Sequence, residues 1–440
     1  MFWSPAEASV AAATGIERWR VGHCGAPVTP ESPIRALRAA PGHTLFELMA
    51  EVALTEDDQD AEVALVVVAN AQPGKLPKSI KRATALSPGV WERLRSGEAF
   101  LVLDASSEGA QADPGVVEEL HGLLSGRGVA PGRTIYVTQD RLFDAEYRRL
   151  CAAQGLSPAL SVLTFDYWIR ALLESYATRG PAIHQRRLEA YRARGDRRSR
   201  RFLSLNLTLR NSKLAFLASA MRDGLWEAGH ISFGGFERRA TKGKSEDVIR
   251  EGFQTDPDFG ALGQTLSAEF ERLAALDEIL LGGGAGSRTG DGRPKFTDDA
   301  DLPEYGDSWF SVITETEMHR VPTRITEKPF KPIANFHPFM VLGNPGALGF
   351  LRRLGFQTFA GLFDEAYDDE PDPRRRFELI YSQFAALCRL DEATLAGRVA
   401  EVSEAVEFNA RHLLIGLPAR CRQTIDRPFM TSLRAIVDRA

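Results

Sequence analysis

The sequence lacks several features that would assign it to a specialised class of protein. Its 440 residues include only four cysteines, and none of them forms a C-x-x-C pair. This scarcity argues against a disulfide framework or a zinc site and for a reducing compartment. No apolar run approaches the length of a transmembrane helix, and the N-terminus lacks the basic and apolar regions of a signal peptide. We therefore expect a cytoplasmic protein without a transmembrane segment.

A strong excess of one charge is also missing. The 54 Lys and Arg residues and 59 Asp and Glu residues give a net charge of −5, so the chain as a whole does not attract nucleic acid or an anionic membrane. The basic stretch 186–201 contains a single aromatic residue, Tyr191, whereas binding of single strands uses several aromatic rings. We interpret the stretch as a solvated connector between domains and expect no nucleic-acid partner.

Motifs for common cofactors and metals are not found either. No G-x-G-x-x-G lies between a predicted strand and a predicted helix, which disfavours a Rossmann oxidoreductase. Asp-x-Asp pairs occur at Asp58/Asp60 and Asp256/Asp258. Both pairs lie in polar loops and neither follows an apolar strand, so we interpret them as solvated turns and expect no metal site.

What the sequence does contain is two series of alternating strands and helices, the pattern of doubly wound α/β domains. The first series has predicted strands at 63–68, 99–103, 134–138 and 160–165, and helices at 116–124 and 142–153. The second has strands at 202–205, 231–233, 309–313 and 339–342, and helices at 211–225, 268–280, 347–354, 373–387, 392–412 and 433–437. We predict a domain over 1–195, a second over 196–415 and a helical tail over 416–440.

The stretch 309–359 places polar residues where two buried strands end. Parallel strands end at one edge of their sheet, and ligands of doubly wound domains bind at that edge. Thr326 is the predicted N-cap of a helix that has Pro329 in its first turn. The residues expected at this edge are Glu315, Glu317, Thr326, Glu327, Lys328 and Gly343.

These residue types suit a nucleotide. A carboxylate such as Glu327 can accept two hydrogen bonds from a ribose diol, and Lys328 beside a helix start suits a diphosphate. The competing interpretation is a capped helix whose Glu and Lys face water. A second element favours the nucleotide: Asn206 and Arg210 lie between a strand and a helix, and a guanidinium grips a diphosphate at two points. Lys213, one turn later, can assist.

The Thr326-Glu327-Lys328 sequence, followed by Pro338-Phe339 and the Gly343-Asn344-Pro345 turn, resembles the nucleotide-sugar site of GT-B glycosyltransferases. The resemblance is to the fucosyltransferase-like family 10 and to related bacterial and phage glycosyltransferases. It implies two Rossmann-like domains that face each other across a cleft, with the donor bound by the C-terminal one. It also implies that Arg210 contacts the donor diphosphate, and that Asn206 and either Glu315 or Glu317 are further donor ligands.

The resemblance implies sugar transfer from a nucleotide-sugar to a hydroxyl of a glycan or another acceptor, in cell-surface glycan synthesis. Such a site can use Arg, Lys and a helix end in place of a cation, so no metal is required. An inverting reaction needs a general base, for which the first domain offers Asp104 or Glu108 at a strand end. A non-catalytic binding or assembly protein with the same fold is the alternative.

Overall fold

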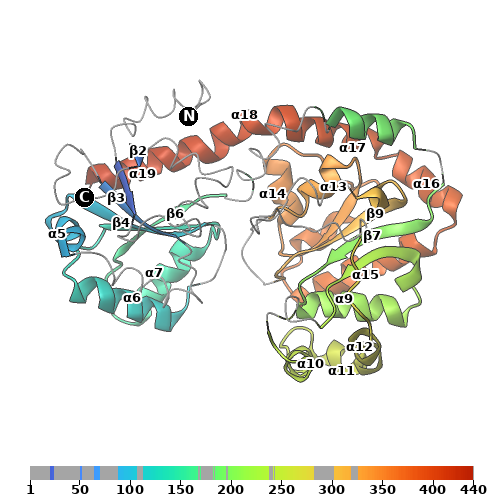
Figure 1. The fold of residues 1–440 in the computed structure, drawn as a ribbon, viewed down its shortest axis with the longest axis horizontal. Helices are drawn as coiled ribbons and strands as arrows, with labels where there is room; N and C mark the ends of the chain where they lie inside the picture. The colour runs from blue at the N-terminus through green and yellow to red at the C-terminus, as the bar shows by residue number, and fades with distance from the viewer. Residues whose placement is uncertain are drawn as a thin grey trace. The chain divides into compact units, whose positions relative to one another are not determined.

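The computed structural model describes the backbone of three short N-terminal segments and most of the chain from residue 88 onward (Figure 1). The described segments are 20–23, 50–51, 64–69, 88–106, 112–166, 184–194, 197–236, 243–281, 302–318 and 326–439, with the single residues 169, 182 and 241. Side chains are described from residue 88 onward. Asp58, Asp60 and Glu108 lie outside the described residues.

The chain divides into two compact units. The first comprises Met1–Glu174 together with Pro418–Ala440, and the second comprises Ser175–Leu417. The division thus falls before the basic stretch 186–201, on which the predicted boundary at 195 rests, and the last residues of the chain belong to the first unit.

A parallel sheet is the centre of the first unit. Its strands follow the order β2-β1-β3-β4-β5-β6, and every described pair is parallel. Their bounds are β1 Arg20–His23, β2 Ala50–Glu51, β3 Ala64–Ala69, β4 Ala99–Ala105, β5 Thr134–Thr138 and β6 Leu160–Thr164. β4 and β5 are buried along their whole length, because helices cover the sheet and leave only apolar environments for these strands. The predicted strands of this unit are confirmed.

Helices lie on both faces of this sheet (Figure 1). One face carries α6 (Pro114–Gly126) and α7 (Phe143–Ala153), and the sequence also folds into α5 (Pro88–Ser96) beside β4. The other face carries the C-terminal helix α19 (Arg427–Arg439), which packs against β6. The rings of Phe165 and Phe429 lie 5.0 Å apart in this contact.

The second unit contains a four-stranded parallel sheet in the order β10-β9-β7-β8. Its strands are β7 Arg200–Asn206, β8 Gly229–Phe233, β9 Ser308–Thr314 and β10 Phe339–Leu342. Phe202 of β7 and Phe310 of β9 pack on Phe384 at ring distances of 4.7 and 6.4 Å. This aromatic cluster fixes the sheet against the helix that carries Phe384. The expected parallel α/β architecture is therefore confirmed in both units.

The helices of the second unit begin where the sequence provides caps. Ser245, Asp372 and Asp391 each accept a hydrogen bond from a backbone N–H of the first turn of α10, α15 and α16. The helices are α9 Asn211–Arg222, α10 Glu246–Gln254, α11 Gly260–Thr265, α12 Ser267–Ala274, α13 Phe330–Ala334, α14 Ala347–Arg353, α15 Pro373–Arg389, α16 Glu392–Ala400 and α17 Ser403–Arg411. Two π-helical turns, His412–Gly416 and Arg422–Asp426, flank the short α18 (Leu417–Cys421).

Three expectations about this unit are wrong in detail. The helix predicted over 268–280 ends at Ala274, and the one predicted over 392–412 is broken between α16 and α17.

The basic stretch is not a solvated connector. Its residues 186–192 are helical, Arg187 is buried and donates to the carbonyl of Ala334, and Arg198 lies over the ring of Trp309. These arginines pack because their apolar stems cover the core while the guanidinium groups reach carbonyls and rings.

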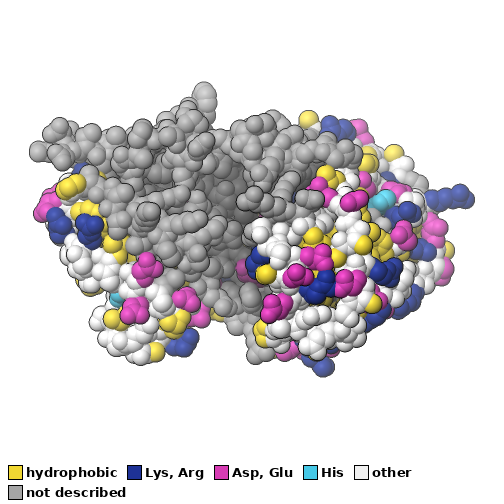
Figure 2. Space-filling view, turned by 60° about the horizontal axis from the view of Figure 1, so that its bottom comes forward, with side chains coloured by type: hydrophobic (Ala, Val, Ile, Leu, Met, Phe, Trp, Pro, Cys, Tyr) yellow, Lys and Arg dark blue, Asp and Glu magenta, His cyan; other side chains and the backbone are white. Residues whose placement is uncertain are grey.

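No helix among the described residues is both long and apolar enough to cross a membrane. On the face shown in Figure 2, the basic and acidic side chains of the described residues are intermingled. The described part of that face therefore presents no broad field of one sign, which agrees with the small net charge of the sequence.

Candidate functional site

The candidate site lies at the carboxyl edge of the second sheet. β7 is paired with β8 on one side and with β9 on the other, so the connections leaving β7 and β8 go in opposite directions. Doubly wound sheets bind ligands at such a switch point. The residues gathered there are Arg210 and Lys213 after β7, Glu315 after β9, Thr326, Glu327 and Lys328 before β10, and Gly343 after it.

Glu315 is the centre of this cluster. Its two carboxylate oxygens accept from the Thr326 hydroxyl at 2.9 Å each, and one of them accepts from the Lys328 ammonium at 3.1 Å. The carboxylate is buried, and Gly343 is needed beside it because a Cβ at that position would lie 3.0 Å from the Glu315 side chain. Glu315 therefore positions Lys328. Glu317, the alternative donor ligand, is half-buried and takes no part in these bonds.

Lys213 is the most unusual group in the cluster. Its side chain lies in the first turn of α9 and is 4% exposed, yet no described residue accepts a hydrogen bond from its ammonium. The pKa of Lys213 is lowered to about 7, first by burial and then by the charges of Lys328 and Arg210, while Glu315 and Glu327 oppose the shift. A buried cation without a partner costs stability, and an anion bound beside it would remove much of that cost.

Glu327 stays ionised at neutral pH. Burial by itself raises the pKa of this half-buried carboxyl, but the charges of Lys328, Lys331 and Lys213, with a backbone hydrogen bond, outweigh burial and lower it. An ionised carboxylate accepts hydrogen bonds from hydroxyl groups, as a ribose diol would require. Glu327 is therefore chemically suited to accept hydrogen bonds from a ribose diol, the role predicted for it.

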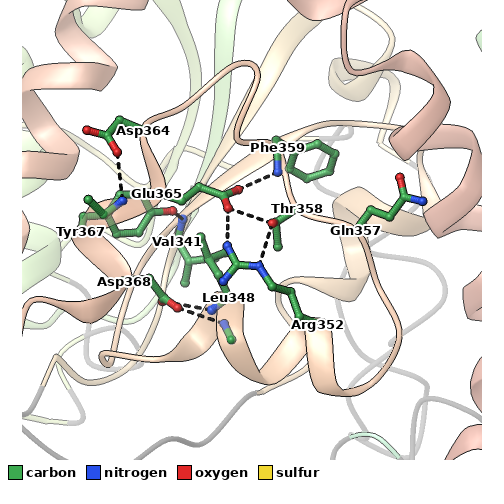
Figure 3. A network of polar contacts seen from close by, with 12 residues as sticks. Val341, Leu348, Arg352, Gln357, Thr358, Phe359, Asp364, Glu365, Tyr367 and Asp368 are labelled. Atoms are coloured by element: carbon green, nitrogen blue, oxygen red, sulfur yellow. Dashed lines mark hydrogen bonds and ion pairs between the residues drawn. The ribbon is translucent and has the colours of Figure 1, made fainter.

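At this edge α9 has an open N-terminus and α14 does not. The N-cap residue of α9 is Arg210, and its side chain does not cap the helix. At α14 the Asp368 carboxylate accepts from the N–H groups of Leu348 and Gly349 at 3.0 and 2.9 Å (Figure 3). Helix N-termini attract anions, and at α14 a protein carboxylate already occupies that position. A phosphate at this edge therefore fits α9.

The prediction that Thr326 is a helix N-cap is wrong. α13 begins at Phe330, its N-cap is Pro329, and it spans only five residues. The Thr326 hydroxyl instead donates to Glu315 and accepts from the Lys328 ammonium at 3.0 Å. The proline ring favours the first turn of a helix, and the Thr326 hydroxyl accepts from the backbone N–H of Lys328 at 3.4 Å, in the turn that precedes α13.

Asn206 and Arg210 occupy different environments. Asn206 is fully buried at the end of β7, donates to Ser204 Oγ at 3.0 Å and accepts from the Thr314 hydroxyl at 2.7 Å. It therefore joins β7 to β9 instead of pointing toward a ligand. Arg210 is half-buried and lines a pocket of about 410 Å³ between α9 and α10. Its charge also lies near enough to Lys213 to affect that pKa.

In the first unit, Asp104 stabilises a turn. One of its carboxylate oxygens accepts from the backbone N–H of Ser106 at 2.9 Å and from the Ser106 hydroxyl at 2.6 Å. The residue is 6% exposed. An aspartate that bonds to the chain two residues later is common in turns, so the observed contacts explain Asp104 without a catalytic role.

Arg376 is a residue of this region that sequence reasoning missed. Its buried guanidinium donates to the carbonyls of Gly343 and Met318 at 2.9 Å each, and also to that of Glu370. It thereby joins the turn after β10 to the loop after β9. A signal was present in the sequence, because Arg376 lies four residues before Ile380 on the apolar face of α15.

Around the site, the described residues offer no metal centre. They contain no group of three or more His, Cys, Asp or Glu side chains that could hold a metal ion. Asp256 accepts from the backbone N–H groups of Asp258 and Phe259, and its second oxygen accepts from Asn211 at 2.6 Å. This pair is therefore a turn that also anchors the start of α9.

No protein-family model matches the chain, and no curated protein is similar to it. The functional argument therefore depends on the site itself. That site is a cluster of three cations and two carboxylates at the switch point of a parallel sheet, beside an uncapped helix.

Proposed function

We propose that this protein is a glycosyltransferase that takes a sugar from a nucleotide-sugar donor and transfers it to an acceptor hydroxyl. The observation that carries the proposal is Lys213, a buried lysine whose ammonium has no hydrogen-bond partner among the described residues. The resemblance of Thr326-Glu327-Lys328 and Arg210 to a donor motif supplies the reaction class. We also propose that the two doubly wound units form a GT-B enzyme, with the donor bound by the second.

Charge favours a diphosphate as the bound group. Among the charges that act on Lys213, Arg210 and Lys328 are cationic and Glu315 and Glu327 are anionic, so these five groups together carry an excess of positive charge whenever Lys213 is protonated. The uncapped first turn of α9 adds backbone N–H groups and the positive end of a helix dipole. A leaving diphosphate gains negative charge as the sugar departs, and fixed cations stabilise it without a metal.

The proposal is tested by a thermal-shift screen of the full chain against nucleoside diphosphates and their sugar conjugates. A ligand at a hundred times its dissociation constant adds about 2.7 kcal/mol of stability. We expect at least one nucleoside diphosphate to raise the melting temperature of the natural protein and to have little effect on Lys213→Met. If no nucleoside diphosphate or nucleotide-sugar stabilises the natural protein, the proposed donor site is wrong.

A further inference from the structure

A pocket of about 410 Å³ adjoins the proposed diphosphate site, and the predicted donor residues do not account for it. It lies between the start of α9 and α10, and Arg210 is part of its wall. Its volume is in the range of small-molecule sites. Leu214 and Ile249 are among its apolar lining residues, and Thr241 and Lys244 among its polar ones.

The charged residues described in the pocket wall are all positive. Of the described residues that line it, Arg210 and Lys244 are cationic and none is acidic. The amide nitrogen of Asn211, also in the wall, donates to Gly252 O at 3.1 Å and to Asp256 Oδ2 at 2.6 Å. The pocket therefore suits a ligand that carries a negative group.

Thr241 provides an independent sign that the pocket is incomplete without a ligand. The residue is 5% exposed, and its hydroxyl has no hydrogen-bond partner among the described residues. Buried hydroxyl groups are normally bonded, and each exception calls for an explanation. A bound molecule with a polar group at this wall would supply the missing partner.

The position of Arg210 indicates which end of the proposed donor faces the pocket. Arg210 contributes to the pocket wall and lies close to the charge of Lys213, whereas Glu327, the proposed ribose ligand, is not among the lining residues. A diphosphate at the first turn of α9 thus has its nucleoside toward Glu327 and its other end toward the pocket. The apolar residues can pack against the C–H face of a sugar ring.

We propose that this pocket binds the sugar of the donor, and that the sugar is an acidic one whose carboxylate lies near Arg210 and Lys244. This inference rests on the proposed function and deepens it by naming the class of sugar. A carboxylate gains a charge-assisted contact at two cations. A neutral sugar of the same shape makes neither contact, so the pocket discriminates between the two.

Sugar 1-phosphates test the inference without knowledge of the nucleotide. Calorimetry at low salt compares glucuronate 1-phosphate with glucose 1-phosphate, and galacturonate 1-phosphate with galactose 1-phosphate, on the full chain. We expect at least one acidic member to bind about tenfold or more tightly than its neutral partner. Pyrophosphate serves as the probe of the phosphate site alone.

Two pocket variants and one control variant test where the preference for an acidic sugar arises. Lys244→Met should remove most of it while leaving pyrophosphate affinity unchanged, and Arg272→Met on α12, an exposed arginine that is not in the pocket lining, should leave it intact. Thr241→Val should fold with undiminished thermal stability, since its hydroxyl bonds to no described residue, but bind the acidic sugar phosphate several-fold more weakly.

The outcomes separate this inference from the proposed function. If pyrophosphate and nucleoside diphosphates bind but acidic and neutral sugar phosphates bind equally, the acidic sugar is refuted and the donor site stands. An equal loss of affinity for all ligands in Lys244→Met also refutes the acidic sugar, because Lys244 would then belong to the phosphate site. If neither pyrophosphate nor any nucleoside diphosphate binds, both proposals are wrong.

Discussion

Replacing Lys213 by Met should make the unliganded protein more stable and weaken binding at the proposed donor site. The two side chains are similar in length, and the lysine is 4% exposed without a hydrogen-bond partner among the described residues. A buried charge without a partner destabilises the folded state, and an apolar side chain of the same volume removes that cost. We therefore expect Lys213→Met to fold and to melt at a higher temperature than the natural protein.

The magnitude follows from the pKa of Lys213, which is lowered from 10.5 to about 7. The unfolded chain keeps this proton up to about pH 10.5, whereas the folded protein releases it above about pH 7, so the free energy of unfolding rises with pH between these values. The full cost at acidic pH is on the order of 5 kcal/mol. The stabilisation by Met should therefore be largest near pH 6 and smaller near pH 9.

The assay is thermal denaturation of the full chain at pH 6 and pH 9, with calorimetric titration of a nucleoside diphosphate. For a domain of this size, 1 kcal/mol shifts the melting temperature by roughly 2–4 °C. Donor affinity should fall roughly ten- to a hundredfold through loss of a charge-assisted contact. Lys331→Met is the matched control, because Lys331 is half-buried in the same unit, and it should show no pH-dependent gain. A variant that is less stable than the natural protein at pH 6 would refute the reasoning.

Three further predictions concern the same edge of the sheet. Glu327→Gln should weaken binding of a ribonucleotide with little change in stability, and calorimetry with a 2′-deoxy donor should show that the two losses do not add. Arg210→Lys should weaken diphosphate binding about tenfold, since a fork that binds at two points becomes a point charge; equal affinity would remove Arg210 from the diphosphate contact. Arg376→Met should lower the free energy of unfolding by about 3 kcal/mol in denaturant titrations, because buried carbonyls lose their donor; an unchanged midpoint would contradict that role.

Most strands from β3 onward could be predicted because they are short apolar runs with turn residues on both sides, whereas β1 and β2 contain no such run and were not predicted. Thr134–Thr138 and Phe339–Leu342 have the bounds expected from the sequence, since every residue in them is buried and the apolar signal has no polar interruption.

The break between α16 and α17 was missed. The helical pattern continues through Val402, which is buried close to Gly361, so periodicity alone does not mark the break.

The candidate site was predictable in its composition but not in its geometry. The motif around Thr326 and Lys328 and the early arginine Arg210 are visible along the chain, and the structure places their charges close together. The environment of Lys213 was not predictable, because three of the charges that shift its pKa, those of Glu315, Glu327 and Lys328, come from a segment about a hundred residues later. Periodicity indicates which face of a helix is apolar, but it does not reveal which distant charges meet that face.

An enzyme that transfers a sugar by inversion needs a general base, which we predict in the first unit, whereas a protein that only binds the donor needs none. One variant tests whether that base is Asp104 or another group such as Glu108. The Asp104 oxygen that accepts from Ser106 is available in an Asn side chain as well. Asp104→Asn should therefore keep the turn, the melting temperature and sugar transfer, while Asp104→Ala should lose stability. If Asp104→Asn binds the donor normally but transfers sugar a hundredfold or more slowly, Asp104 is the general base after all. Retained transfer in Asp104→Asn assigns that role to Glu108 or to another group, because an amide cannot take the proton of the acceptor hydroxyl.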